Sequence, residues 1–558
     1  MQVLPIGEQN FEEIRKNNWL YVDKTKKILQ MIENGKYYFL SRPRRFGKSL
    51  TISTLEAMFK GKTELFKDLY AENWVKSHAK HPNPVIKLDM SVLGNYQNIE
   101  EFNNSIIKSL ERFLFVNDLN FPSEKNAGSM LSNIITRLYK EFGKVVVLID
   151  EYDKPITENI NDLEKAEEIR KYLRSFYIIL KGSSEYLRFV MLTGVSKFSK
   201  AGVFSGLNNL QDISMKEEYS DIVGYTQQEL EDNFIDWIEK ATKKLSLTKN
   251  ELLQKIKRNY DGFSFDGKKR VYNPYSILNF FNDQEFNNYW YKSATPSFLA
   301  DYLKQHQINN FEQFRHLEVP SDFADEHEIE KSTPESFLFQ AGYLTIEKKE
   351  RKDELIILTL DYPNEEVKKS MSRLFLKDIY KIDKYIPLGD NLWQAIKSLN
   401  EGNIEKIVEI FNNALGKIPY SDFPKNQNEY WYRSLFVMLL RGGAGVTSFQ
   451  ESYTSEGRSD LIIPFDDKII IIEFKFAKSS KGVPKARTEG EEQVKQYAKT
   501  YENENKKIIT VVLVADNRKR KITMWTKKKN EENNLNRGNL GLLWNINQLT
   551  QRIKLRRK

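Results

Sequence analysis

The stretch Ser41-Arg42-Pro43-Arg44-Arg45-Phe46-Gly47-Lys48-Ser49 decides the fold of the first part of this chain. It follows a short apolar run, Tyr37–Leu40, that predicts a buried strand, and it opens an amphipathic pattern, Ser49–Phe59, that predicts a helix. A strand, a glycine-containing loop and a helix in this order are the context of a phosphate-binding loop. A basic turn before a helix is the alternative, because Arg42 stands where such loops usually have their first glycine.

The residue types in this loop suit a nucleoside triphosphate. Gly47 would let the backbone approach a phosphate, Lys48 would reach the β- and γ-phosphates, and Ser49 would ligate Mg²⁺. The N-terminus of the following helix would add its partial positive charge. We therefore expect ATP and Mg²⁺ as ligands of this loop.

A second element strengthens this expectation. The apolar run Val145–Ile149 predicts a strand that ends in Asp150 and Glu151. Asp150 can hold Mg²⁺ through water, and Glu151 can orient or deprotonate the attacking water. The next predicted strand, Arg188–Leu192, ends at Thr193, which could sense the γ-phosphate.

The pattern of elements predicts three regions. Up to residue 215, short apolar runs alternate with helical patterns, which indicates a parallel, doubly wound sheet with helices on both faces. Helical patterns dominate from 216 to 385. In the last part, predicted helices come first and strands follow. We therefore predict an α/β domain over residues 1–215, a mainly helical lid or linker region over 216–385 and an α/β domain over 386–558, with helices at Leu392–Leu415 and Glu429–Leu440 and strands near Leu461–Ile463, Lys468–Phe476 and Ile508–Val514.

The last region carries a second group of chemistry-bearing residues. Asp460 precedes one predicted strand, and Glu473 and Lys475 end the next. If the two strands form a hairpin with its turn at Asp466-Asp467, antiparallel pairing places Asp460 opposite Glu473, with Cβ atoms about 5 Å apart. Lys475 then lies on the same face as Glu473. A slip of one residue would separate these groups.

Two carboxylates at this spacing suit Mg²⁺, which prefers oxygen ligands. A water positioned by Lys475 could then attack a phosphodiester. Glu451 could complete the acidic cluster, and Gln493 and Tyr497, four residues apart on one helical face, could position the lysine, a water or a phosphate. Chance is the alternative, because the pattern is short, but charges at the end of an isoleucine-rich strand are unfavourable unless paired or metal-bound.

The stretches Tyr21–Thr25, Ser41–Ser49, Leu148–Pro155 and Leu192–Phe198 resemble the AAA-ATPase-like family of prokaryotic proteins, over roughly residues 3–280. In that family the RPRRFGKS loop is the normal form of the phosphate loop, so the absent first glycine is no objection. The resemblance implies a P-loop NTPase domain that binds and hydrolyses ATP. It implies Glu151 as a catalytic residue, Ser49 and Asp150 as Mg²⁺ ligands, and a nucleotide site made of Arg42, Arg44, Arg45, Phe46, Gly47, Lys48, Ser49, Leu50, Asp150 and Thr193.

The order Glu451, Asp460, Glu473-x-Lys475, Gln493-x-x-x-Tyr497 resembles the PD-(D/E)XK nuclease superfamily, over roughly residues 425–520. More narrowly, it resembles the nuclease domain that commonly follows AAA-ATPase-like domains. The usual proline before the first catalytic aspartate is replaced by Ser459. The resemblance implies a restriction-endonuclease-like domain in which Glu451, Asp460 and Glu473 hold Mg²⁺ and in which Asp460, Glu473, Lys475 and Gln493 are catalytic.

Composition narrows the chemistry and the partner. The chain of 558 residues has no cysteine, which excludes disulfides, thiolate metal sites and iron–sulfur clusters. None of its five histidines lies in a metal-binding spacing. Residues 401–558 hold 29 basic and 19 acidic side chains, whereas residues 1–400 are nearly neutral. An acidic partner should therefore dock on the C-terminal region, where Arg518–Lys521 and Lys527–Lys529 could bind phosphates; a solvated strand edge is the alternative for these runs.

Together these patterns predict an ATP-binding and ATP-hydrolysing protein coupled to a Mg²⁺-dependent DNA nuclease, in defence or in mobile-element and recombination processes. One alternative is an ATP-driven switch or scaffold whose C-terminal domain binds nucleic acid without cleaving it. A second alternative is an ATP-regulated interaction protein with no nucleic-acid role. We expect a prokaryotic, cytoplasmic protein with no membrane partner, since no apolar run approaches the roughly 18 residues that a membrane span needs. A homo-oligomer is suggested only by analogy with AAA-type rings.

Overall fold

The computed structural model divides into two compact units. Unit 1 comprises Met1–Ile396 and Asn413–Thr447, and unit 2 comprises Lys397–Asn412 and Ser448–Lys558. The structure describes residues 1–122, 124–159, 162–197, 203–204, 206–290, 299–308, 311–324, 333–380, 397–399, 401–418, 427–443, 453–454, 457–458, 460–465, 467–501 and 506–529.

Unit 1 begins with a five-stranded sheet in the order β2-β3-β4-β1-β5, and every neighbouring pair is parallel. The predicted parallel, doubly wound sheet is therefore confirmed. In space β4 lies between β1 and β3, although β2 separates β1 from β3 in the sequence. The strands are β1 (Tyr37–Ser41), β2 (Val85–Asp89), β3 (Val145–Asp150), β4 (Leu187–Gly194) and β5 (Gln211–Asp212).

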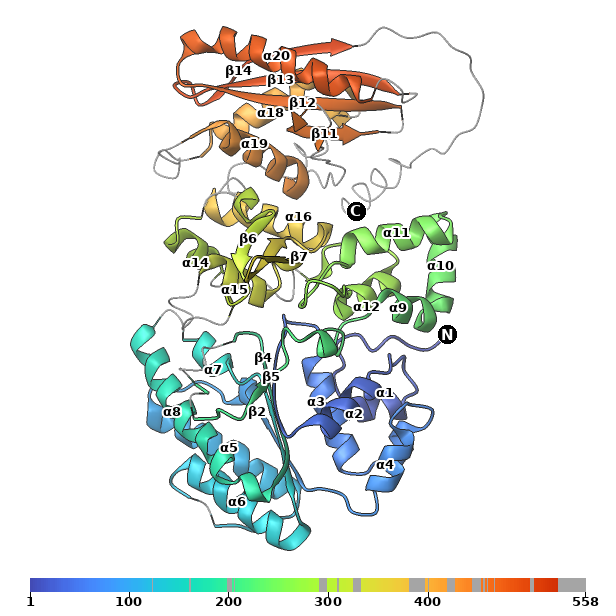
Figure 1. Ribbon diagram of the computed structural model, residues 1–558, viewed down its shortest axis with the longest axis vertical. Coiled ribbons are helices and arrows are strands. Elements are labelled where there is room, and N and C mark those ends of the chain that lie inside the picture. The colour runs from blue at the N-terminus through green and yellow to red at the C-terminus, as the bar shows by residue number, and fades with distance from the viewer. Residues whose placement is uncertain are drawn as a thin grey trace, which may run out of the picture. The chain divides into compact units, whose positions relative to one another are not determined.

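Helices cover both faces of this sheet (Figure 1). One face packs against α5, α6 and α8 in a single apolar cluster, and α3 packs on the other, where Phe59 contacts Phe189 of β4. Short polar side chains set the starts of α5, α6 and α8, since Asn98, Asn126 and Asp162 each accept a hydrogen bond from the N–H three residues on. The helices are α1 (Phe11–Lys16), α2 (Thr25–Asn34), α3 (Lys48–Phe59), α4 (Glu72–His78), α5 (Ile99–Val116), α6 (Ala127–Phe142), α7 (Lys154–Thr157) and α8 (Leu163–Gly182).

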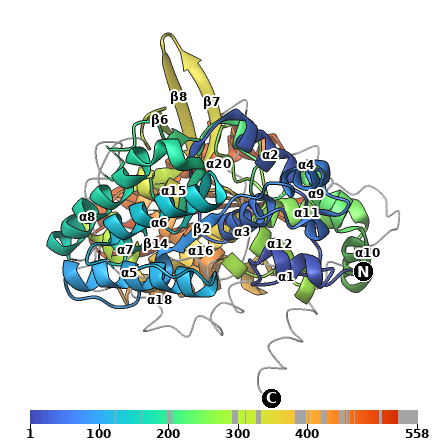
Figure 2. The same cartoon turned by 90° about the horizontal axis from the view of Figure 1, so that it is seen from below.

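The middle of the chain is mainly helical, as predicted, but it also contains a small antiparallel sheet in the order β6-β8-β7. The β7–β8 hairpin projects beyond the neighbouring helices (Figure 2). The elements are α9 (Gln227–Asn233), α10 (Ile235–Leu245), α11 (Lys249–Tyr260), α12 (Pro274–Asp283), α14 (Leu299–Gln305), β6 (Leu317–Pro320), α15 (Pro334–Ala341), β7 (Thr345–Lys352), β8 (Leu355–Asp361) and α16 (Glu365–Leu374), and unit 1 also includes α19 (Glu429–Met438). Helix α18 (Ile404–Leu415) lies between them in the chain and belongs mostly to unit 2.

Unit 2 contains a four-stranded sheet in the order β11-β12-β13-β14. The β11–β12 and β13–β14 pairs are antiparallel, and α20 connects β12 to β13, which are parallel. Apolar side chains of α20 pack on one face of β12 and β13. The elements are β9 (Tyr453–Thr454), β10 (Gly457–Arg458), β11 (Leu461–Pro464), β12 (Lys468–Ala477), α20 (Val483–Lys499), β13 (Lys507–Asp516) and β14 (Lys521–Lys529).

Within the described residues of both units, no helix has the length and apolarity needed to cross a membrane.

Candidate active sites

The first candidate site lies where three neighbouring strands of the unit 1 sheet end. The register pairs Leu40 with Thr193 and Ile149 with Leu192, so the carboxyl ends of β1, β4 and β3 reach the same edge. The phosphate-loop sequence leaves this edge after β1 and enters α3 at Lys48. Parallel strands thus bring together residues that lie more than 100 positions apart in the sequence.

The loop has the backbone of an anion-binding turn. Gly47 adopts φ +95°, a conformation that L side chains rarely take, immediately before α3. No described side chain caps the first turn of α3, so its N–H groups keep the partial positive charge of a helix N-terminus. Ser49 and Leu50, the next two residues, are partly exposed in this first turn.

Lys48 is buried in the loop and points at the loop's own backbone. Its Nζ donates hydrogen bonds to the carbonyl oxygens of Arg42 at 2.9 Å and Pro43 at 3.1 Å. Burial lowers the pKa of Lys48, while the charges of Asp150 and Glu151 oppose that shift. Both carbonyls are neutral acceptors, and the oxygens of a phosphate group can replace them.

The arginines of the loop differ in environment. Arg42 is only 1% exposed, and its guanidinium donates to the carbonyl oxygens of Ser41, Ser214 and Tyr219. It also stacks 3.9 Å from the ring centroid of Phe265. Burial lowers the pKa of Arg42 to about 9. The guanidinium is thus engaged by backbone and ring, whereas Arg44 is half-buried and Arg45 is exposed.

Residues of the middle region hold the phosphate loop in place. Phe46 is buried with its ring centroid 4.9 Å from that of Phe263, in an edge-to-face arrangement. The indole N–H of Trp290 donates to the carbonyl oxygen of Arg44 at 3.3 Å. Gly342 packs so closely on Pro43 that a Cβ there would lie 2.6 Å from the proline ring. The phosphate-loop sequence and the middle region therefore form one packed assembly within unit 1.

The acidic strand end lies beside Thr193, as the sequence predicts. Asp150 is 4% exposed and accepts hydrogen bonds from the Thr193 hydroxyl and from the N–H of Glu151. Glu151 has φ +49°, an uncommon conformation for a non-glycine residue. Burial and the neighbouring Asp150 raise the pKa of Glu151, while Lys48 lowers it. A carboxylate whose pKa is raised towards neutrality is better suited to accept a proton.

Asp153 is a feature of this site that the sequence reasoning did not identify. It is 3% exposed, and its carboxylate accepts hydrogen bonds from the N–H groups of Val195 and Ser196. Burial raises the pKa of Asp153, and those hydrogen bonds and Lys48 oppose the shift. Asp153 thereby ties the end of β3 to the end of β4. The only available signal was its position three residues after Asp150.

The second candidate site lies on the β11–β12 hairpin of unit 2. Leu461 pairs with Ile472 and Pro464 with Ile469, which is the predicted register. Continuing this register by one residue places Asp460 opposite Glu473, and Asp460 Oδ2 accepts the N–H of Phe474 at 2.8 Å. The hairpin therefore brings the two carboxylates together.

Lys475 joins this pair from the same strand. Its Nζ donates to Glu473 Oε1 at 2.8 Å, and the side chains of Glu473 and Lys475 are only 4% and 11% exposed. Both residues share a face of β12 with Ile471, the face that α20 covers. A buried carboxylate and lysine on an apolar strand require a charged partner or a bound ion, and each supplies a partner to the other.

Helix α20 approaches this centre through Gly490. A Cβ at Gly490 would lie 2.6 Å from Val512 and 3.1 Å from Cγ of Lys475, so a glycine is needed for this close packing. Gln493 is one helical turn further along α20 and is half-buried, and Tyr497 is buried. The structure thus places Gln493 on the helix that covers Glu473 and Lys475. Glu451, the remaining predicted ligand, lies outside the described residues.

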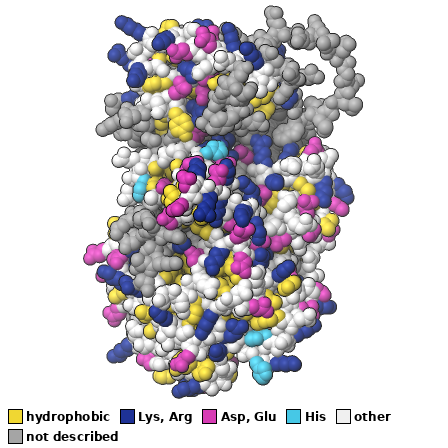
Figure 3. Space-filling view, in the orientation of Figure 1, with side chains coloured by type: hydrophobic (Ala, Val, Ile, Leu, Met, Phe, Trp, Pro, Cys, Tyr) yellow, Lys and Arg dark blue, Asp and Glu magenta, His cyan; other side chains and the backbone are white. Residues whose placement is uncertain are grey.

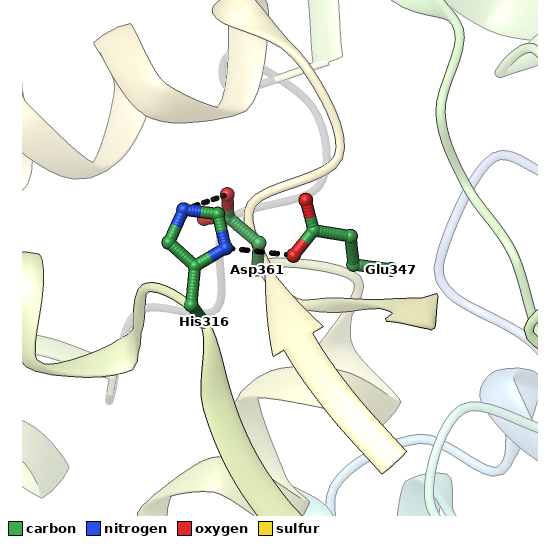
Figure 4. A group of neighbouring side chains, drawn as sticks. All are labelled: His316, Glu347 and Asp361. Carbon is green, nitrogen blue, oxygen red and sulfur yellow. Dashed lines mark hydrogen bonds and ion pairs between the residues drawn. The ribbon is translucent and has the colours of Figure 1, made fainter. Parts of the chain in front are cut away.

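The middle region contains one group of possible metal ligands among the described residues, formed by His316, Glu347 and Asp361 (Figure 4). The two carboxylates face opposite nitrogens of the ring: Glu347 lies 2.7 Å from Nδ1 and Asp361 3.9 Å from Nε2. Arg315 also contacts Asp361 at 3.3 Å. One cation can take only one ring nitrogen, so this arrangement forms an ion-pair network. The hydrogen bond that the His316 ring donates to Glu347 raises the pKa of His316 accordingly.

Comparison with known proteins agrees with this geometry. Residues 5–204 match the model of a predicted AAA-ATPase family, and residues 427–525 match the PD-(D/E)XK nuclease superfamily. A relative described as an uncharacterized protein in the vnfD 5′ region of Azotobacter chroococcum mcd 1 is 34% identical over 481 residues, covering 85% of this chain and 89% of its own length. A solved structure, Cdc6p from Pyrobaculum aerophilum, is 12% identical and covers 63% of this chain and 91% of its own, with a TM-score of 0.22. That last likeness is too low to bear on the fold.

The family model covers the parallel sheet and its phosphate loop, the superfamily model covers the sheet with Asp460, Glu473 and Lys475, and a relative shares most of the full length. The chain therefore belongs to the family of predicted AAA-ATPases that carry a PD-(D/E)XK nuclease superfamily domain.

Proposed function

We propose that this protein binds and hydrolyses ATP in unit 1 and cleaves DNA with Mg²⁺ in unit 2. The observation that carries the nuclease proposal is the convergence of Asp460, Glu473 and Lys475 on one buried hairpin, with Lys475 Nζ 2.8 Å from Glu473 Oε1. A buried carboxylate paired to a lysine at the end of an apolar strand is unfavourable for stability alone and therefore favours a role in chemistry.

The residues in unit 2 fit a divalent cation. Asp460 and Glu473 supply the oxygen ligands that Mg²⁺ prefers, and Glu451 is a further candidate from the sequence. When bound, Mg²⁺ would lower the pKa of a coordinated water and stabilise the charge that develops on the phosphate. Lys475 would orient the attacking water and Gln493 would position the lysine or a phosphate oxygen. The N–H of Phe474 holds Asp460 against the strand during the reaction.

The residues in unit 1 fit a nucleotide. Lys48 would exchange its two loop carbonyls for phosphate oxygens, and Ser49 and Asp150 would hold Mg²⁺. Glu151 would accept a proton from the attacking water, and Thr193, hydrogen-bonded to Asp150, would sense the γ-phosphate. The half-buried Arg44 and the exposed Arg45 would contact phosphate oxygens, with Gly47 and Leu50 lining the cradle.

One experiment separates cleavage from binding. Wild-type protein and Glu473→Gln are incubated with duplex and single-stranded DNA, with Mg²⁺ or EDTA, and with or without ATP. We expect Mg²⁺-dependent cleavage by wild type and at least a hundredfold loss in Glu473→Gln, because one ligand loses its charge. Equal cleavage by both proteins would reject the nuclease assignment. Lys48→Ala is the matched test of unit 1, and unchanged ATP hydrolysis in that variant would reject the nucleotide site.

A switch without cleavage is the alternative function, and the packing of the loop on Phe263, Phe265 and Trp290 favours it. Movement of Lys48 towards a phosphate would break its hydrogen bonds to the carbonyl groups of Arg42 and Pro43. The loop that contains these carbonyls packs on the three aromatic residues, so the change would be passed to the middle region. Such a switch predicts ATP-dependent DNA binding with no cleavage above the Glu473→Gln background. A role in defence, or in mobile-element and recombination processes, is a prediction from the sequence alone, which does not choose between them.

A further inference from the structure

Two loops of unit 2 meet at one end of its sheet. The connection from β12 to α20 spans residues 478–482, and the turn from β13 to β14 spans residues 517–520. The N–H of Asn517 donates to the carbonyl oxygen of Ala477 at 3.0 Å, and the Ser480 hydroxyl donates to Asp516 Oδ2 at 2.5 Å. Each hydrogen bond thus joins one connection to the last residue of the strand that precedes the other connection.

The β13–β14 turn is also fixed internally. Asp516, which is fully buried, accepts the N–H groups of Arg518 at 3.0 Å and Lys519 at 3.2 Å through Oδ1. Its carboxylate therefore stabilises the turn by accepting hydrogen bonds from the backbone of the turn. The backbone of Arg518 and Lys519 is thereby fixed while both side chains are exposed, which reduces the backbone entropy lost when this turn binds a ligand.

The two loops carry a concentrated positive charge. Lys478, Lys481, Arg518, Lys519 and Lys521 are all exposed, and we call these five residues the basic patch. Within the described part of the chain, none of the five forms an ion pair with an acidic residue. The two loops themselves contain no acidic residue. On the face of unit 1 seen in Figure 3, basic and acidic side chains are interspersed.

The basic patch continues from the candidate nuclease centre. Lys475 on β12 lies beside Val514 on β13, and two residues on, Ala477 lies beside Asp516. Both strands then enter the loops that carry the patch. At roughly 3.3 Å per residue, Lys478 begins about 10 Å beyond Lys475. A polyanion that approaches this centre from the loop end of the sheet would therefore pass over the patch.

We propose that the basic patch binds the phosphate backbone of DNA and guides it into the centre formed by Asp460, Glu473 and Lys475; the identity of the polyanion rests on the proposed nuclease function. Phosphate contacts of this kind position a duplex without reading its sequence. An anionic membrane fits less well, because no large apolar side chain is exposed among the residues of unit 2 whose exposure the structure describes, a set that leaves out residues 524–529.

The test measures binding separately from cleavage. Full-length protein carrying Glu473→Gln, in EDTA, is titrated with a fluorescein-labelled 30-base-pair DNA duplex, and anisotropy is recorded from 50 to 300 mM KCl. The patch variant adds Lys478→Gln, Lys481→Gln, Arg518→Gln and Lys519→Gln. A control variant instead adds Arg487→Gln, Lys495→Gln, Lys499→Gln and Lys507→Gln, four exposed cations of unit 2 that give the same change in net charge. Thermal melts establish that all three proteins are folded.

We expect the patch variant to bind DNA at least tenfold more weakly at 100 mM KCl, with the slope of log K against log[salt] smaller by about 0.9 for each lost phosphate contact. The control variant should change each quantity by less than half as much. Equal losses in both variants, or no loss in the patch variant, would overturn the proposal, as would tighter patch-dependent binding to phosphatidylserine vesicles or polyglutamate. Absence of cleavage by wild type would instead count against the nuclease function alone.

Discussion

Arg42 and Arg45 of the phosphate loop carry the same charge but lie in opposite environments. Arg42 donates to three backbone carbonyls from residues 41, 214 and 219, whereas Arg45 is exposed and contacts only the ring of Tyr275, at 5.1 Å, among the described residues. The guanidinium of Arg42 therefore ties the loop to segments that are distant in the sequence. Arg42 is not among the residues with a positive φ, so this position of the loop needs no glycine.

We predict that Arg42→Met lowers the free energy of unfolding by about 3 kcal/mol or more, because it leaves three buried carbonyls without that donor. Arg45→Ala should lower it by less than about 1 kcal/mol but raise the KM for ATP if Arg45 contacts phosphate. Urea denaturation and ATPase assays of both variants provide the measurement. Similar stabilities for the two variants would contradict this division of roles.

Glu366 is a buried carboxyl group that couples the middle region to the loop. It accepts the N–H of Trp290 at 2.8 Å and the hydroxyl of Ser276 at 2.7 Å, and the indole of Trp290 in turn holds Arg44. Burial raises the pKa of Glu366 to about 7. Between its ordinary pKa and that value the folded protein binds a proton that the unfolded chain has released, so stability must fall as pH rises through this range.

Glu366→Gln tests this linkage, because glutamine cannot titrate. The free energy of unfolding of the variant minus that of wild type should rise by up to about 3 kcal/mol between pH 5 and pH 8. The altered hydrogen bonding adds only an offset that does not depend on pH. Chemical denaturation at pH 5, 6, 7 and 8 measures the difference. A difference between the two proteins that does not vary with pH would contradict the raised pKa.

At the level of elements, the spacing between α20 and its sheet depends on Gly490. A methyl group there would meet Val512 and the stem of Lys475. We predict that Gly490→Ala destabilises the protein by about 1–3 kcal/mol and reduces DNA cleavage at least tenfold, since the helix or the lysine must move. Gly482→Ala is the control, because its added Cβ would lie at an ordinary 3.8 Å from Ala477. Equal activity of the two variants would show that Lys475 tolerates the shift.

Elements defined by local pattern were predictable, and those defined by distant partners were not. The register of the β11–β12 hairpin follows from two short apolar strands and the turn assumed between them, so Asp460 and Glu473 could be paired from the sequence. The roles of Arg42 and Asp153 could not, since their partners are Ser214 and Tyr219 in one case and Val195 and Ser196 in the other. Nothing in a linear pattern specifies such contacts.

One predicted helix is interrupted by a turn, although its apolar residues follow a helical period throughout. The apolar pattern Leu392–Leu415 predicts a continuous helix, but a turn interrupts it at Gly402, which adopts φ +65°. The side chain of Asn403 then accepts the N–H of Lys406 and starts α18 afresh. The interpretation of a single helix is therefore wrong over its described part, because a Gly-Asn pair ends one helix and caps the next.

At the scale of the whole molecule, the chain passes between the two units more than once. Residues 413–447 belong to unit 1, although unit 2 contributes residues on both sides of them. Helix α19 accordingly packs within unit 1: Arg433 lies 2.6 Å from the buried Glu312, and the indole of Trp431 donates to Tyr380. The predicted domain boundary at residue 385 remains a prediction, and a truncation decides it.

A chain ending at residue 385 would lose α19 and with it the guanidinium partner of Glu312, which is 4% exposed. Loss of one member of a buried ion pair lowers stability by about 3–5 kcal/mol, and the apolar side chains of α19, including Leu435 and Met438, would be lost from the core as well. We therefore expect the chain ending at 385 to aggregate or to melt well below a chain ending at residue 447. Both should be compared by thermal melting and by ATP binding. If the shorter chain melts at the temperature of the longer one and binds ATP equally well, residues 413–447 add nothing to unit 1 and the boundary at 385 is correct.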